Sequence, residues 1–260
     1  MVFDEKTDNI LFEKNADRLS YPASLTKLMT LYLTFEALES GKIKENQVLK
    51  MSAYGAEISA VNKYSTFSAK EGFEVTVKKA IHAVIVKSFN EAAVILGEAV
   101  SGDEWHFSRA MNEKARQLGM INTSFRNASG LHHEGQYTTA YDLGRLTKAI
   151  KNDFPGYYHL FSMRNFEHNG LEYKTHNHVL EEYKGAEGMK TGFTNASGFN
   201  LISSAYKENH RVVSIILGCA TYQGRDIVTK GLLDLAFEKL SKTKSESPAK
   251  LSLGFNYNNS

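Results

Sequence analysis

The chain has 260 residues, 42% of them hydrophobic, and a formal net charge of +2. This length and composition predict one domain with a sizeable core, and a nearly balanced charge without a basic run argues against a nucleic-acid partner. One cysteine, Cys219, excludes an internal disulfide, and no segment approaches the length that spans a membrane.

The start of the chain predicts a hairpin followed by a long buried helix. Two short strand-like runs, residues 2–4 and 10–13, flank a polar turn. The helix is predicted from Tyr21 to Ser40, with Pro22 at its start and Gly41 after its end. Apolar residues recur along it at helical spacing and also fill much of the other side, so we expect burial nearly all round.

The middle of the chain is predicted to be mostly helical. Residues 42–74 are mixed and polar, and we expect irregular structure there beside a cleft. Hydrophobic spacing then predicts helices at 75–86, 91–100, 105–118 and 138–150.

The last third predicts strands and one helix. Loops or short strands over 161–180 precede a strand that begins at Lys190, and the runs 199–206 and 211–217 form an antiparallel hairpin. A helix at 226–240 and a linker or tail at 241–260 follow. This order predicts an α+β catalytic domain over 1–240, in which one antiparallel sheet built from both chain ends packs against helices. A mostly helical subdomain is inserted at about 42–160.

A serine and a lysine three positions apart open the long helix. Ser24 and Lys27 share a helical face, which brings the amine within reach of the hydroxyl. A lysine on so apolar a helix loses water, which lowers its pKa towards the range of a general base, and neutral lysine can then accept the serine proton. The pattern alone is weak because Ser-x-x-Lys occurs four times, but the other three copies lie in a predicted strand or in the polar tail.

Two further motifs each occur once. Ser88-Phe89-Asn90 lies between two predicted helices, where Asn90 is alternatively a helix cap, and Lys190-Thr191-Gly192 begins a strand, where Lys190 is alternatively a surface lysine. Ser-x-x-Lys, Ser-x-Asn and Lys-Thr-Gly in this order are the signature of penicillin-binding proteins and class A β-lactamases.

On these motifs the chain resembles a D-alanyl-D-alanine carboxypeptidase of the low-molecular-mass penicillin-binding protein family, which has the β-lactamase/transpeptidase-like fold. The resemblance extends over residues 2–240. It is carried by the segments 22–27, 119–125, 137–143, 187–194 and 197–201, and by Gly224-Arg225-Asp226, which resembles the family's carboxylate-binding arginine.

The resemblance implies a serine-type hydrolase that removes the terminal D-alanine from peptidoglycan stem peptides ending in D-Ala-D-Ala, through an acyl-enzyme. It further implies acylation by β-lactam antibiotics, a role in cell wall biogenesis and a periplasmic or extracytoplasmic location with the export signal removed. Membrane association stays open, because the chain carries no anchor. No cofactor is implied.

The resemblance also assigns roles to residues. Ser24 is the nucleophile, Lys27 its base, and Ser88 the proton shuttle to the leaving amine. The substrate-binding set is Asn90 for the substrate amide; the backbone N–H groups of Ser24 and Phe193 for the oxyanion; Lys190, Thr191 and Arg225 for the terminal carboxylate; and Gly192 for close approach of the substrate backbone.

Two departures from the family qualify this picture. Phe89 stands where members often have glycine, which predicts a stiffer loop and a more aromatic entrance. We expect neither the second, β-rich domain nor the amphipathic membrane anchor of many members.

Other interpretations of the sequence are weaker. His132-His133 and the pair His176 and His178 suggest zinc, but no third ligand has convincing spacing, so we expect no metal. A Ser-His-Asp triad lacks a Gly-x-Ser-x-Gly motif. Two alternative functions stay open, a serine β-lactamase and a non-catalytic peptidoglycan- or β-lactam-binding domain.

Overall fold

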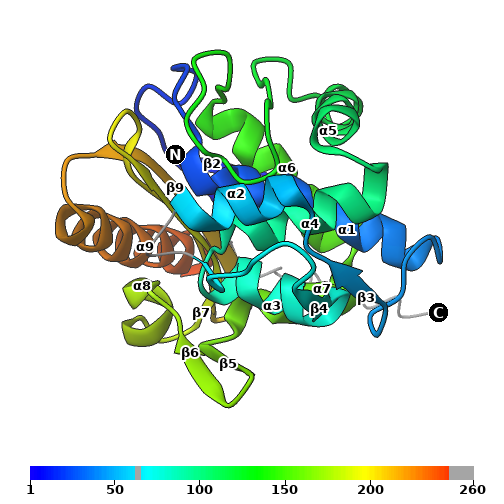
Figure 1. Cartoon of the computed structure of the whole chain (residues 1–260). Helices are drawn as coiled ribbons and strands as arrows, with labels where there is room; N and C mark the ends of the chain where they lie inside the picture. The colour runs from blue at the N-terminus through cyan, green and yellow to red at the C-terminus, as the bar shows by residue number, and fades with distance from the viewer. Residues whose placement is uncertain (62–65, 246–260) are drawn as a thin grey trace, which may run out of the picture.

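The structure, a computed structural model, describes residues 1–61 and 66–245 (Figure 1). Its centre is a five-stranded antiparallel sheet in the order β2-β1-β9-β8-β7. The strands are β1 Val2–Asp4, β2 Ile10–Phe12, β7 Ala186–Thr194, β8 Gly198–Lys207 and β9 His210–Cys219. The prediction of an antiparallel sheet built from both chain ends is therefore confirmed.

Helices cover both faces of this sheet, which explains why its inner strands are buried almost throughout (Figure 1). Successive residues of a strand point to opposite faces. On β8, Leu201 packs with the apolar residues of the C-terminal helix, whereas Ile202 belongs to the larger core around the helical part. The sheet thus separates two apolar layers.

The helical part surrounds a central helix. A 3₁₀ turn, η1 (Ala23–Thr26), leads into α1 (Lys27–Glu39), which is buried on nearly all sides as predicted. The other helices are α2 Ala53–Val61, α3 Val77–Val86, α4 Asn90–Ser101, α5 Glu104–Gln117, α6 Ala140–Asp153, α7 Pro155–Tyr158, the 3₁₀ turn η2 His159–Ser162, α8 His178–Glu182 and α9 Tyr222–Ser245. The predicted helices at 75–86, 91–100, 105–118 and 138–150 are confirmed within a few residues.

Side-chain caps determine several of these helix starts. Thr76, Asp103 and Thr139 each accept a hydrogen bond from the backbone N–H three residues on, at the beginnings of α3, α5 and α6. Each bond satisfies one of the free donors of a first helical turn.

Three predicted segments differ from the structure. Residues 42–74 are not wholly irregular, because β3 (Val48–Lys50) pairs with β4 (Glu74–Thr76) and α2 lies between them. In the first turn of α2, the Gly55 N–H donates to the Ser52 hydroxyl. The nucleophile helix begins as a 3₁₀ turn at Ala23 and not at Tyr21. The last helix extends from Tyr222 to Ser245, so a linker at 241–245 is wrong; residues 246–260 lie outside the described residues.

A second small sheet completes the frame. β5 (Asn165–His168) pairs with β6 (Leu171–Lys174), confirming short strands in this region. Across the described ranges every helix is too short or too polar to span a bilayer.

Candidate active site

The turn that carries Ser24 is fixed by contacts from distant segments. The Asn200 side-chain amide donates to the carbonyl oxygens of Tyr21 and Pro22, at 3.0 and 3.1 Å. Ala23 has a φ of +49°, a conformation that a non-glycine residue adopts only when its surroundings enforce it. These contacts hold Ser24 between β8 and the start of α1.

Two glycines allow the chain to close around this turn. A Cβ on Gly130 would lie 2.0 Å from the Ala23 carbonyl oxygen, and a Cβ on Gly192 would lie 3.1 Å from the Pro22 carbonyl oxygen. Gly130 also has a φ of +82°, which favours glycine. From the sequence, Gly192 was expected to let the substrate backbone approach β7. In the structure, Gly192 first of all lets β7 approach the turn that carries Ser24.

The Lys27 side chain is fully buried beside Ser24. Its Nζ lies 2.9 Å from the Ser24 Oγ and donates to the Asn90 Oδ1, at 2.7 Å, and to the Ser129 carbonyl oxygen. The last two oxygens only accept, so they use two N–H bonds, and in the neutral amine the remaining lone pair faces the Ser24 hydroxyl. Ser24 and Lys27 are therefore arranged for proton transfer.

Burial is the main reason why the pKa of Lys27 is lowered well below its ordinary value. The charge of Lys190 lowers the Lys27 pKa further, and the carboxylate of Glu91 opposes the shift. The sequence argument that an apolar helix strips this lysine of water agrees with the structure.

Ser88 and Asn90 take different positions around Lys27. Asn90 is the first residue of α4 and its side chain faces Lys27, while Phe89 holds the capping position without a side-chain bond, so the alternative of Asn90 as a cap is wrong. Ser88 has a φ of +61°, and its buried Oγ has no hydrogen-bond partner among the described residues. Its hydroxyl is thus available to a bound molecule.

Phe89 turns away from the entrance. Its side chain is 1% exposed, and its ring lies 4.7 Å from the Phe67 ring and 5.4 Å from the Tyr173 ring, both edge to face. The prediction of a more aromatic entrance at Phe89 is therefore wrong, because the β5–β6 hairpin and the segment at Phe67 provide an aromatic cluster that takes up the ring.

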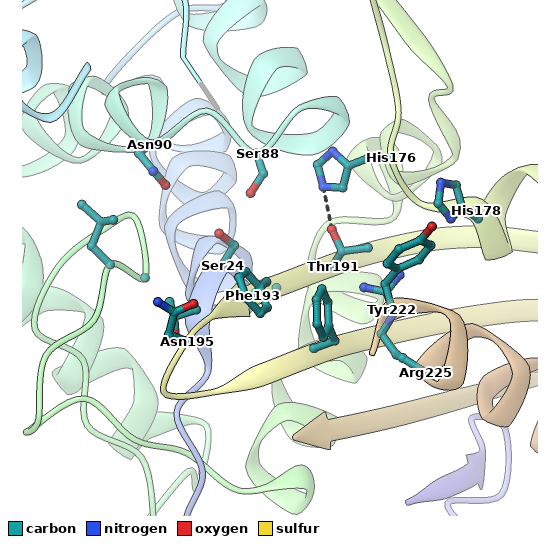
Figure 2. A pocket seen from close by; sticks show the side chains of 15 residues that line it. Ser24, Ser88, Asn90, His176, His178, Thr191, Phe193, Asn195, Tyr222 and Arg225 are labelled. Atoms are coloured by element: carbon teal, nitrogen blue, oxygen red, sulfur yellow. Dashed lines mark hydrogen bonds between the residues drawn. The ribbon is translucent and has the colours of Figure 1, made fainter. Parts of the chain in front are cut away.

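Opposite Ser24, the cavity ends in cationic and hydroxyl groups. Thr191 presents its Oγ1 to the cavity, and Arg225 lines the same end (Figure 2). Lys190 is buried beneath them and donates to the Thr191 carbonyl oxygen at 3.2 Å. Burial, aided by the charge of Arg225, lowers the pKa of Lys190 to about 7. Lys190 is therefore no surface lysine.

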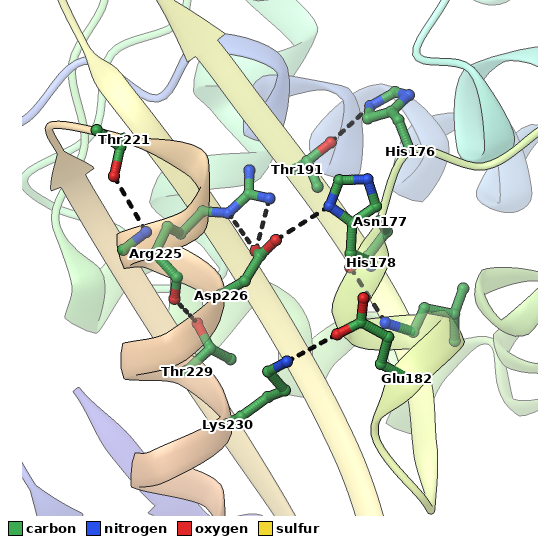
Figure 3. A network of polar contacts seen from close by, with 12 residues as sticks. His176, Asn177, His178, Glu182, Thr191, Thr221, Arg225, Asp226, Thr229 and Lys230 are labelled. Carbon is green, nitrogen blue, oxygen red and sulfur yellow. Dashed lines mark hydrogen bonds and ion pairs between the residues drawn. The ribbon is translucent and has the colours of Figure 1, made fainter.

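A polar network supports Arg225 (Figure 3). Its Nε and Nη2 donate to one oxygen of Asp226, Oδ1, at 2.8 and 2.7 Å. The Nδ1 of His178 lies 3.3 Å from the other oxygen, Oδ2. An ion pair with the next residue of the same helix thus holds the guanidinium, which also lines the cavity.

One cavity of about 550 Å³ brings these groups together (Figure 2). Lys27 and Lys190 lie beneath its wall, and no carboxylate side chain of the described residues lines it. Phe193, which is 49% exposed, stacks on Phe199 at 4.2 Å and forms an aromatic rim. The lining residues are Ser24, Ser88, Asn90, Gly130, Leu131, His176, His178, Thr191, Gly192, Phe193, Thr194, Asn195, Phe199, Tyr222 and Arg225.

Sequence reasoning missed several of these contributors. The Ser129 carbonyl is a backbone group and leaves no signal in residue types. His176 was weighed only as a metal ligand, but its Nε2 lies 2.7 Å from the Thr191 Oγ1. Within the described residues no group of three histidine, cysteine or carboxylate side chains is arranged to hold a metal ion.

Comparison with known proteins agrees with this geometry. The family model described as D-alanyl-D-alanine carboxypeptidase matches residues 1–221. The carboxypeptidase DacF of Bacillus subtilis (strain 168) is 34% identical over 92% of this chain and 61% of its own length, and DacA of Escherichia coli (strain K12) is 32% identical over 91% and 60%. The chain thus spans about three fifths of the length of these curated relatives.

Solved structures show the same likeness. Penicillin-binding protein 5 from Haemophilus influenzae superposes with a TM-score of 0.87 at 33% identity, covering 91% of this chain and 69% of that one. Penicillin-binding protein D2 from Listeria monocytogenes in its ampicillin-bound form has a TM-score of 0.79 at 30% identity, covering 91% and 95%. The resemblance inferred from the motifs is confirmed: the chain belongs to the family of D-alanyl-D-alanine carboxypeptidases.

Proposed function

We propose that this chain is a serine-type carboxypeptidase that removes the terminal D-alanine from peptidoglycan stem peptides ending in D-Ala-D-Ala. The observation that carries the proposal is the buried Lys27 amine, 2.9 Å from the Ser24 Oγ, beneath a cavity whose far end presents Thr191 and Arg225. A nucleophile and a carboxylate receptor in one cavity fit a substrate whose scissile bond lies next to its free terminus.

Acylation uses the groups in sequence. The Ser24 oxygen attacks the carbonyl carbon of the penultimate D-alanine while Lys27 takes the hydroxyl proton. The backbone N–H groups of Ser24 and Phe193 stabilise the oxyanion, and Ser88 passes a proton to the leaving nitrogen. The amide C–N bond breaks and D-alanine departs, after which water hydrolyses the ester on Ser24.

Charge explains the preference for a chain end. Arg225 presents a guanidinium and Thr191 a hydroxyl donor, so a carboxylate is attracted to this end of the cavity. A substrate that continues beyond this point has a neutral amide there and loses this attraction. The cavity therefore favours a carboxypeptidase over an endopeptidase.

We further propose that β-lactams acylate Ser24 and leave slowly. The Listeria monocytogenes relative is described in ampicillin-bound and cefotaxime-bound forms. In the present chain no carboxylate side chain of the described residues lines the cavity to activate a deacylating water, which disfavours the β-lactamase alternative. We assign the catalytic domain to residues 1–240. Because the proposed substrate is part of the cell wall, we propose that the enzyme acts outside the cytoplasm.

The decisive experiment measures D-alanine release from diacetyl-Lys-D-Ala-D-Ala. We expect release by the wild type and none by Ser24→Ala, together with a stable penicilloyl adduct on Ser24 by mass spectrometry. Rapid penicillin turnover without an adduct would instead identify a β-lactamase. Penicillin or peptide binding without any release would identify a binding domain.

A further inference from the structure

His176 contacts the Lys-Thr-Gly motif from outside it. It lies between β6 and α8, and its Nε2 is 2.7 Å from the Thr191 Oγ1, with both residues lining the cavity (Figures 2 and 3). A histidine ring thus touches the hydroxyl that faces the carboxylate end.

The backbone on both sides of His176 is anchored by hydrogen bonds. The Thr175 N–H donates to the Arg164 carbonyl oxygen at 2.6 Å, and the Asn177 N–H donates to the Thr175 hydroxyl at 3.2 Å. Asn177 is itself buried and caps α8 through the Leu180 N–H. Residues on both sides of His176 are therefore anchored, so the backbone that carries the ring is held in place.

The surroundings keep His176 neutral. Burial, followed by the charges of Lys190, Lys87, Arg225 and Lys27, lowers the pKa of His176 to about 3. A neutral imidazole has one nitrogen that donates and one that accepts. The direction of the hydrogen bond to Thr191 therefore depends on which ring nitrogen carries the hydrogen.

Only one direction leaves Thr191 able to bind an anion. A carboxylate only accepts, and a threonine hydroxyl has a single hydrogen. If Thr191 donates to the ring, no hydrogen remains for the carboxylate. If the ring donates from Nε2, the Thr191 hydrogen is free to point into the cavity.

Building on the proposed function, we propose that His176 is a positioning residue: its neutral Nε2–H tautomer donates to Thr191 and aims the Thr191 hydroxyl hydrogen at the terminal carboxylate of the substrate. Arg225 and Thr191 then have matching support, the first from Asp226 and the second from His176.

A pair of peptides separates this role from a structural one. Diacetyl-Lys-D-Ala-D-Ala carries the carboxylate, and its C-terminal amide does not. Replacing His176 by leucine is expected to lower kcat/KM for the acid about tenfold, chiefly through KM, which is the loss typical of one hydrogen bond to a charged group. The amide is expected to change less than about twofold, because its terminal group is neutral.

Three variants sharpen the result. His176→Gln keeps an N–H at a similar reach and should restore most of the acid activity. The exposed His159, which does not line the cavity, provides the control His159→Leu, for which we expect wild-type kinetics. In a Thr191→Val background, His176→Leu should add no further loss, because the ring then has no hydroxyl to orient. An equal loss on acid and amide, or full additivity with Thr191→Val, would overturn the proposal.

The tautomer is tested without any turnover. In protein labelled with ¹⁵N-histidine, long-range proton–nitrogen spectra should show His176 protonated at Nε2 alone, its signals assigned by their loss in His176→Gln. Protonation at Nδ1 alone, or at both nitrogens, at neutral pH would refute the proposal. If the wild type releases no D-alanine, the proposed function fails, while this measurement still decides where the hydrogen lies.

Discussion

The buried Lys190 adds to burial in lowering the pKa of the buried Lys27, so the cationic end of the cavity and the proposed general base are electrostatically linked. Both side chains lie beneath the cavity wall and neither reaches bulk water. A positive charge nearby disfavours a second one, and this effect is strong where water is excluded. Lys190 therefore affects the protonation of Lys27 as well as the charge at this end of the cavity.

Replacing Lys190 by methionine is expected to raise the pKa of Lys27, because a positive neighbour is removed. The neutral base then forms only at higher pH. The pH at which Ser24 acylation reaches half its maximal rate should therefore rise by about one unit, which corresponds to about 1.4 kcal/mol of interaction between the two lysines. This midpoint is measured with a fluorescent penicillin across pH. Lys50→Met, at an exposed lysine, is the control. A midpoint that stays in place would show that Lys190 does not tune Lys27.

In the wild type, affinity for a carboxylate-terminated peptide should fall as pH rises through about 7, where Lys190 loses its proton. Lys190 is charged and attracts the carboxylate below this pH, and it is neutral above it. The expected signature is a rise in KM for the acid peptide with little change for its amide. Equal pH dependence of the two KM values would contradict it.

Gly130→Ala should abolish most acylation without unfolding the protein. The added Cβ would collide with the Ala23 carbonyl oxygen, so the turn that positions Ser24 must shift. A displaced nucleophile loses on the order of a hundredfold in rate. The rate of penicilloyl formation and the thermal midpoint are compared with Gly231→Ala, where nothing lies within 4 Å of the new Cβ. Near-wild-type acylation by Gly130→Ala would show that the turn tolerates the shift.

Phe89→Ala is expected to lower the free energy of unfolding by about 3–5 kcal/mol, because the buried ring leaves a cavity in the aromatic cluster. Acylation should fall as well, since Ser88 and Asn90 flank the vacated position. Phe89→Leu refills most of the volume and should lose less of both. Chemical denaturation and penicillin labelling measure the two effects. A neutral Phe89→Ala would mean that the cluster does not hold this loop.

Local patterns were enough to predict much of the site. Ser24 and Lys27 are one helical turn apart, so their contact follows from spacing alone. Ser88, Asn90 and Thr191, each part of a short motif in the sequence, line the same cavity as Ser24. The hydrophobic spacing of the helices was equally informative, and most were confirmed within a few residues.

What sequence could not supply were directions and distant partners. The motif Ser88-Phe89-Asn90 does not by itself predict that the Phe89 ring is buried. Its burial depends on Phe67 and on a hairpin some eighty residues later in the chain. The Ser129 carbonyl and the contact of His176 with Thr191 likewise depend on tertiary packing. The helix at Ala53–Val61 was missed because its surroundings are polar and few of its residues are buried.

The pairing of β1 with β9 ties the second residue of the chain to residue 214. Contacts between residues this far apart in the sequence form late in folding, because closing so long a loop costs conformational entropy. When synthesis has reached only residue 180 of this sequence, Ser24 and Lys27 are present but β7, β8 and β9, which complete the sheet beside them, are not yet made. The cavity that joins Ser24 to Thr191 and Arg225 can therefore form only after the C-terminal strands and helix have been made.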